Sequence, residues 1–171
     1  MDEAFLIRLQ STLQQIRLDL LNNAEIRKLV FYSSDSMTNK SISDLTDVSM
    51  VEASNFIVLQ PVYDGGTEPP FNSGTCITIS TSNGSVSEDG IIADYVVRVS
   101  VICDKKNWTF NSGKIRPIIL AQDIINILHN KKYDCSNQIH FVRYMEQIVT
   151  KTQFGYALLF SVSDGVASET T

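Results

Sequence analysis

Apolar side chains occupy every second position between residues 95 and 103. The odd-numbered positions from Tyr95 to Cys103 are all apolar, whereas the even-numbered positions include Arg98 and Ser100. Alternation with a period of two is typical of a strand that is covered on one face by other parts of the protein. The pattern therefore predicts a long strand over residues 91–104, with one face in the core.

Two longer segments show the three- and four-residue spacing of amphipathic helices. Residues 2–21 carry a leucine-rich stripe, and Asp2 is a suitable N-cap. A second long helix begins near Pro117, which is tolerated in a first helical turn, and ends near His129. A short helix over residues 24–32 is expected between them, with Asn23 as its N-cap.

Four further strands are predicted at residues 56–62, 76–81, 137–150 and 154–162. Polar stretches join the elements, among them a long loop at 33–55 with a helical turn near 45–53, a loop at 63–74 and a hairpin tip at 82–90. This order favours an α+β fold, in which the N-terminal helix and the second long helix pack on a largely antiparallel or mixed sheet. We expect a single domain over residues 1–163 and a flexible C-terminal tail over 164–171.

Composition narrows the class of protein. The chain has 171 residues, 43% of them apolar, which suits one domain with a substantial core. No apolar run approaches the roughly 20 residues that a membrane-spanning helix needs. The acidic start, Met1-Asp2-Glu3, does not have the basic residues of a secretory signal. We therefore expect a protein that is made in a cytoplasm and has no membrane partner.

Charge is unevenly distributed along the chain. Residues 33–95 contain nine acids and one base, whereas residues 96–151 contain nine bases and four acids. One interpretation is that both stretches are simply solvated. The sharper hypothesis is that oppositely charged surfaces join copies of the molecule head to tail. A nucleic-acid groove is less favoured, because the bases are spread over several elements and the net charge is −5.

The sequence contains no recognisable catalytic or cofactor motif. Phosphate-binding loops, dinucleotide fingerprints and nucleophile elbows are absent from it. His129 and His140 do not stand at metal-ligand spacing, and Cys76, Cys103 and Cys135 are best interpreted as reduced, mostly buried thiols. We expect no enzyme activity, no cofactor and no metal; a hydrolase site at Cys135 or Asp89 is the weakest alternative.

Two aromatic residues, Trp108 and Phe110, stand in the otherwise polar turn over residues 105–113. They either form a hydrophobic lid that folds back on the following helix or anchor a partner protein, a role for which aromatic side chains are well suited.

Several segments together resemble the tail terminator (neck) proteins of long-tailed bacteriophages. The similar features are the strand at 95–103, the Gly113-Lys-Ile-Arg-Pro117 turn, the helix at 119–128, the Ala24–Leu29 run before Phe31-Tyr32, and the closing segment 154–160. The order of elements is similar over nearly the whole chain.

The resemblance implies a structural protein of the virion, assembled in the host cytoplasm. Proteins of this family form a ring, usually of six copies, which caps the tail tube, ends tube polymerisation and joins the tail to the head connector. Their partners are copies of themselves, the tail tube protein and head–tail connector proteins, and DNA only passes through the ring lumen. A head-closure or tail-completion adaptor of the same neck is a close alternative, and a non-viral ligand-binding or adaptor module is a more distant one.

A hypothesis for the subunit interface follows from the charge distribution. Basic residues beside the long strand and at the start of the second long helix would meet acids of the next copy. The predicted interface residues are Arg98, Lys114 and Arg116 on one side and Asp64, Glu68, Glu88 and Asp89 on the other, and Trp108 is a further predicted interface residue.

Overall fold

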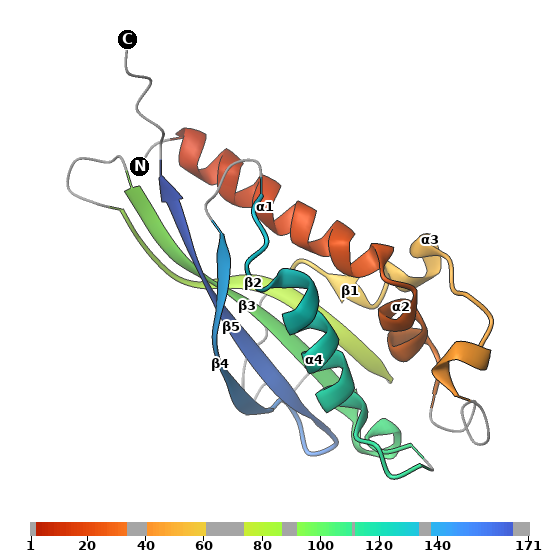
Figure 1. Ribbon diagram of the computed structural model, residues 1–171. Helices are drawn as coiled ribbons and strands as arrows, with labels where there is room; N and C mark the ends of the chain where they lie inside the picture. The colour runs from red at the N-terminus through yellow and green to blue at the C-terminus, as the bar shows by residue number, and fades with distance from the viewer. Residues whose placement is uncertain are drawn as a thin grey trace.

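The computed structural model describes residues 3–33, 41–60, 74–86, 92–110, 112–133 and 138–165 (Figure 1). Its helices are α1 (Glu3–Asn22), α2 (Ala24–Phe31), η2 (Ile42–Asp44), α3 (Met50–Ala53), η3 (Lys105–Asn107) and α4 (Arg116–Leu128). Its strands are β1 (Ile57–Val58), β2 (Thr75–Val86), β3 (Ile92–Asp104), β4 (Ile139–Ile148) and β5 (Gln153–Gly165).

The five strands form one mixed sheet in the order β1-β2-β3-β5-β4. The short strand β1 pairs with β2 in parallel, and the other neighbours are antiparallel. Strands β3 and β5 lie in the centre, and β1 and β4 lie at the two edges (Figure 1). The predicted α+β fold with a largely antiparallel, mixed sheet is confirmed.

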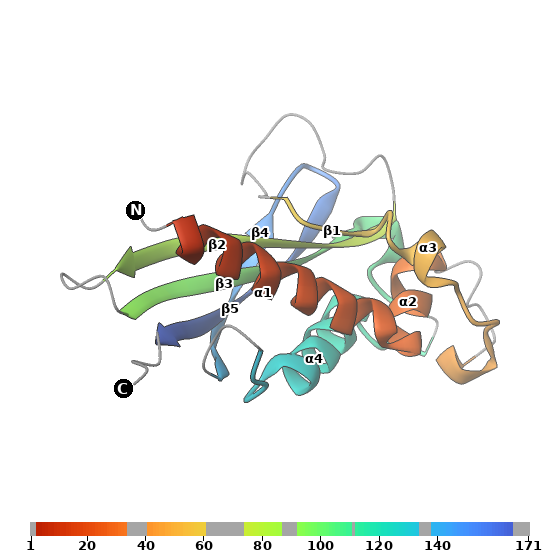
Figure 2. The same cartoon turned by 90° about the horizontal axis from the view of Figure 1, so that it is seen from above.

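Helices α1, α2 and α4 cover one face of the sheet (Figure 2). The predicted alternation in β3 places Val97, Val99 and Val101 on this face, and all three are fully buried. Leu120 and Ile124 of α4 are buried in the same core. Burial of apolar side chains at these spacings is what holds the helices on the sheet, because each fully buried aliphatic side chain contributes about 1.5–3 kcal/mol.

The helix boundaries agree closely with the sequence pattern, and the strand boundaries agree less well. The side chain of Asn23 accepts a hydrogen bond from the Ile26 N–H at 3.0 Å, as its predicted N-cap role requires. Strand β1 is shorter than the predicted 56–62. Strand β2 continues to Val86, well past the predicted end at 81, because the backbone of its polar end pairs with β3 up to Val86↔Ala93. Strand β5 extends to Gly165, two residues into the predicted tail.

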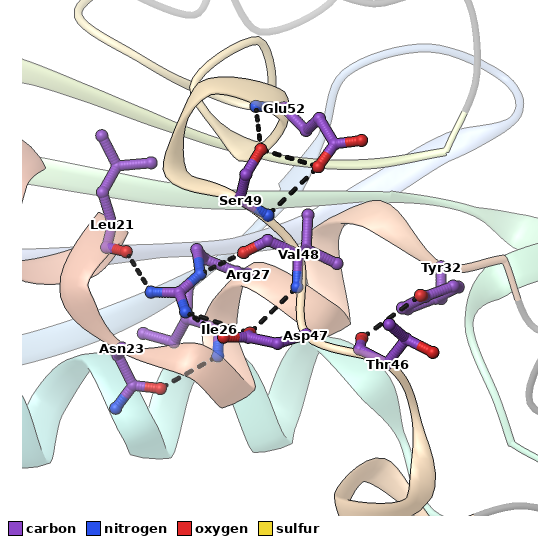
Figure 3. Close-up of polar contacts among 10 residues, drawn as sticks. All are labelled: Leu21, Asn23, Ile26, Arg27, Tyr32, Thr46, Asp47, Val48, Ser49 and Glu52. Carbon is purple, nitrogen blue, oxygen red and sulfur yellow. Dashed lines mark hydrogen bonds and ion pairs between the residues drawn. The ribbon is translucent and has the colours of Figure 1, made fainter.

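Arginine side chains connect the helical layer to its loops. Arg17 of α1 donates to the carbonyl oxygens of Ile57 and Ser54 at 2.6 and 3.1 Å. Arg27 of α2 donates to Leu21 O and Val48 O and forms an ion pair with Asp47 at 2.9 Å (Figure 3). These contacts hold the segment after residue 41 against α2.

Two of the three thiols are placed as predicted. Cys76 and Cys103 are buried and free, and burial raises the pKa of both. Cys135 and the hairpin-tip acids Glu88 and Asp89 lie outside the described residues. No helix in the described part of the chain is long and apolar enough to cross a membrane.

Candidate functional site

The edge strand β4 exposes large apolar side chains to solvent. Val142 is 57% exposed, Tyr144 63%, Met145 38% and Ile148 64%. In the sheet as described, no strand pairs with the outer side of β4. Because an isolated subunit gains nothing from exposing these side chains, the strand has the character of a binding surface.

The protections that usually keep sheet edges from pairing are weak here. Lysine, proline and bulges commonly protect an edge strand from pairing with other chains. Strand β4 contains no lysine or proline, and its only charged residues are Arg143 and Glu146. One bulge interrupts its register between Phe141 and Arg143. The strand is therefore suited to accept another strand.

The outward backbone groups of β4 can be assigned from its pairing. Val149 N–H donates to Gln153 O at 3.0 Å, so position 149 bonds to β5. In an antiparallel ladder such positions alternate with positions whose N–H and C=O point away from the neighbouring strand. By this alternation, Tyr144, Glu146 and Ile148 direct their backbone groups to the outer edge.

An aromatic groove lies beside β4 on the helix-covered face of the sheet. It has a volume of about 420 Å³, and Trp108, Ile148, Phe154 and Tyr156 line it. Trp108 packs against Phe154 and Tyr156, with ring centroids 6.4 and 6.2 Å apart. Tyr144 extends the aromatic surface, because its ring lies 5.8 Å from that of Tyr156.

Lysines form part of the rim of this groove. The exposed residues Lys105 and Lys151 line it, together with Glu146. Lys105 N–H donates to Thr152 O at 2.9 Å, which fixes η3 beside the β4–β5 hairpin. Burial, followed by the nearby Glu146 and Tyr144, raises the pKa of Tyr156, so this phenol stays neutral. The site is thus an apolar surface with a mainly cationic rim.

Trp108 therefore does not fold back on α4 as a lid. Its ring packs on two aromatic residues of β5, and the side chain is half-buried. Phe110, in contrast, turns toward the helix, where the Arg116 guanidinium lies 4.8 Å from its ring centre. The two aromatic residues of this turn thus have different roles.

The prediction that Arg116 belongs to the subunit interface is wrong. The Arg116 side chain is fully buried and donates hydrogen bonds through Nη1 to Leu29 O, at 2.6 Å, and to Tyr32 O. Burial lowers the pKa of this guanidinium. Arg116 satisfies carbonyl groups at the C-terminal end of α2 within its own subunit, so it is not available to a neighbouring copy.

The remaining predicted interface residues do not form one cluster. Arg98 is half-buried and, by the alternation of β3, faces away from the helices. Lys114 is exposed in the turn before α4. Asp64, Glu68, Glu88 and Asp89 lie outside the described residues. Contact of Arg98, Lys114 or these acids with another copy stays a prediction.

Sequence reasoning missed most of the groove. Its floor combines β4, β5 and η3, which only the folded sheet brings together, and Lys105 and Lys151 are 46 positions apart in the numbering. One signal was present in the sequence. Residues 139–148 carry apolar side chains at both odd and even positions, as a strand buried on both faces or covered at its edge would.

The aromatic lining of the groove and its lysines are features that suit the binding of another molecule. The described residues hold no group of three or more His, Cys, Asp or Glu side chains placed to bind a metal ion. In a comparison with known proteins, a family model described as YomW matches residues 23–162. No curated protein matches the chain.

Proposed function

Since the chain belongs to the phage-derived YomW family, we propose that it is a structural protein of the phage particle that assembles into a ring at the neck. In this role it caps the finished tail tube, ends tube polymerisation and joins the tail to the head connector. The resemblance to tail terminator proteins supports this specific position, and the surface of the subunit supports assembly.

The observation that carries the proposal is the exposed edge of β4. Its four exposed apolar side chains and its outward backbone groups are suited to meet a neighbouring subunit. A ring needs two different surfaces on each subunit, because a single self-complementary patch closes after two copies. The basic and acidic stretches of the chain are a second way in which two surfaces of one subunit can differ from each other.

Work at the neck requires binding and not catalysis. A ring protein must hold its neighbours, stop the addition of tube subunits and leave a central passage for DNA. The groove and the edge strand lie on one five-stranded sheet, and the groove has the aromatic anchors that protein interfaces favour. Both features agree with a binding role.

Native mass spectrometry of the purified full chain tests the proposal, together with negative-stain images. We expect one defined assembly of several copies, six if the resemblance holds, seen as a ring in projection. A monodisperse single subunit at high concentration would contradict the proposal.

A second measurement separates the neck positions. Assembled protein is mixed with purified tails and with DNA-filled heads of the phage that encodes it. A tail terminator binds the end of the tail tube and still leaves a surface for the head, whereas a head-closure adaptor binds heads without tails. Binding to heads alone would favour the adaptor alternative.

A further inference from the structure

A short exposed helix carries a second apolar surface, separate from the groove. In α3, Val51 is 79% exposed and Met50 is 38% exposed, whereas Ala53 is fully buried. The turn is rigid, because Ser49 and Glu52 form a reciprocal capping box (Figure 3). Two apolar side chains therefore project on a fixed support; we call Met50, Val51 and Glu52 the α3 knob.

The surroundings of the α3 knob are acidic. Residues 41–60 contain three acids and no lysine or arginine. All three acids, Asp44, Asp47 and Glu52, are exposed, and Asp47 also forms an ion pair with Arg27. Hydrogen bonds from Ser49 lower the pKa of Glu52, which keeps this carboxylate charged at neutral pH. The α3 knob is thus an apolar projection beside negative charge.

The α3 knob and the groove are complementary in both respects. The groove is concave, aromatic and bordered by Lys105 and Lys151, whereas the knob is convex, aliphatic and bordered by carboxylates. We propose that the α3 knob of one copy docks in the aromatic groove of the next copy. Val51 and Met50 contact the ring of Trp108 and its aromatic neighbours, and Glu52 faces the two lysines.

The positions of the two surfaces make this contact head to tail. The segment containing α3 leads into β1 at one edge of the sheet, whereas the groove adjoins β4 at the other edge (Figures 1 and 2). Because the two surfaces differ, every docked copy leaves one knob and one groove open until the chain of contacts closes into a ring. The inference rests on the proposed ring and names the contact that builds it.

Substitution of Val51 by aspartate tests the knob. A carboxylate in place of Val51 would have to be buried against aromatic rings, so we expect at least about a tenfold weaker association in sedimentation velocity. The change is exposed in the subunit, so the melting of the dissociated protein should be unchanged. Ile7→Asp is the matched control, since Ile7 is 62% exposed on α1 at the far end of that helix. Equal association of both variants would overturn the inference.

Charge reversal tests the groove. Lys105→Glu combined with Lys151→Glu should weaken association, most strongly at low salt, because it places two carboxylates opposite Glu52. Lys132→Glu, an exposed position outside both the groove and the α3 knob, is the control for the single variants Lys105→Glu and Lys151→Glu and should leave association within about twofold. A loss in Lys132→Glu as large as in either single groove variant would show a general charge effect and contradict the docking contact.

Cysteine trapping identifies the contact between copies directly. Single variants Val51→Cys and Ile148→Cys are prepared separately, mixed after dissociation and oxidised. A disulfide-linked dimer should form only in the mixture, because each new thiol then meets the other across the contact. If the wild-type protein forms rings but the mixture gives no linked dimer, the inference fails and the ring proposal survives. If the wild-type protein stays a single subunit, the ring proposal itself fails.

Discussion

Arg116 illustrates how one side chain can be reassigned by the fold. From the sequence alone, a charged residue at the start of a helix is expected to lie on the surface of the protein. In the subunit it is fully buried, because it meets carbonyl oxygens of α2 that lie 84 and 87 residues earlier in the chain. A guanidinium carries several donors in a planar fork and remains charged when buried, so it suits a helix C-terminus, where carbonyl groups have no helical partner.

Replacing Arg116 by methionine should therefore destabilise the subunit. Methionine fills similar space, but it leaves the carbonyl groups of Leu29 and Tyr32 without this donor. We expect a loss of about 2–3 kcal/mol in the free energy of unfolding, measured by denaturant titration. Lys114→Met, two positions earlier and exposed, should change stability by about 0.5 kcal/mol or less. Similar stability of the two variants would exclude this role for Arg116.

Gly155 in β5 permits a close approach of β3. A Cβ atom at this position would lie 1.7 Å from the carbonyl oxygen of Val101. Gly155→Ala must therefore displace one of the two central strands, and we expect a loss of about 3 kcal/mol or more in thermal or chemical unfolding. At Gly84, by contrast, a Cβ would lie 3.4 Å from its nearest neighbour. Gly84→Ala should be tolerated, and an equally large loss there would contradict the steric argument.

At the scale of elements, the ion pair between Arg27 and Asp47 joins α2 to the segment before α3. The hydrogen bond from Arg27 lowers the pKa of Asp47 below its usual value of 3.8. A carboxylate whose pKa is lowered by folding stabilises the native state above its unfolded pKa, and this contribution disappears as the pH falls through the folded pKa.

The stability difference between wild type and Asp47→Asn should therefore depend on pH. We expect the wild type to be more stable at pH 7, and the difference should shrink as the pH falls from about 4 toward 2. Urea unfolding at several pH values measures it, and contributions of the other carboxylates cancel in the comparison. A difference that stays constant over this range would show that the charge of Asp47 does not act in the folded state.

The edge strand β4 gives a second prediction at the element scale. Glu146 directs its backbone N–H outward, so proline at this position removes a donor that β5 does not use. We expect Glu146→Pro to fold but to lose assembly in native mass spectrometry. Glu146→Ala removes the same carboxylate and retains the N–H, so it should still assemble. If the proline variant assembles as well as the alanine variant, no strand is added at β4.

For the whole molecule, assembly should be visible in thermal stability. A protein that buries surface only when assembled becomes more stable as its concentration rises, by mass action. We expect the melting temperature to rise between about 1 and 100 μM protein in scanning fluorimetry. Because Val51→Asp is expected to associate at least about tenfold more weakly, it should need a correspondingly higher protein concentration for the same rise. A wild-type melting temperature that is independent of concentration would argue against the ring.

The local pattern of apolar and polar residues was sufficient to predict the main helices and the long central strand of this fold. Periodicity placed α1, α2, α4 and the long strand β3 nearly at their observed bounds, because side-chain spacing of two or of three and four reports which face of an element is buried. The N-cap role of Asn23 could also be predicted from the sequence, because it depends on a residue only three positions away. The extension of β2 to Val86 could not be predicted from the sequence, because pairing with β3 overrides the low strand preference of its polar residues.

Only part of the candidate site could be predicted from the sequence. Trp108 was identified as a possible anchor from its polar surroundings, whereas its partners Phe154 and Tyr156 were predicted only as residues of the last strand. Their convergence depends on the order of strands, which places β4 outside β5 and brings η3 beside the hairpin.

By itself, the sequence determined the α+β class, the covered face of the sheet and the uneven charge of this protein, because these follow from spacing and composition along the chain. The tertiary structure alone decided that Arg116 is an internal donor, that β4 presents its apolar side chains at an edge, and that the aromatic groove adjoins one edge strand of the sheet whereas the exposed knob precedes the other. These are contacts between residues far apart in the sequence, and only the closed fold fixes which surfaces remain uncovered.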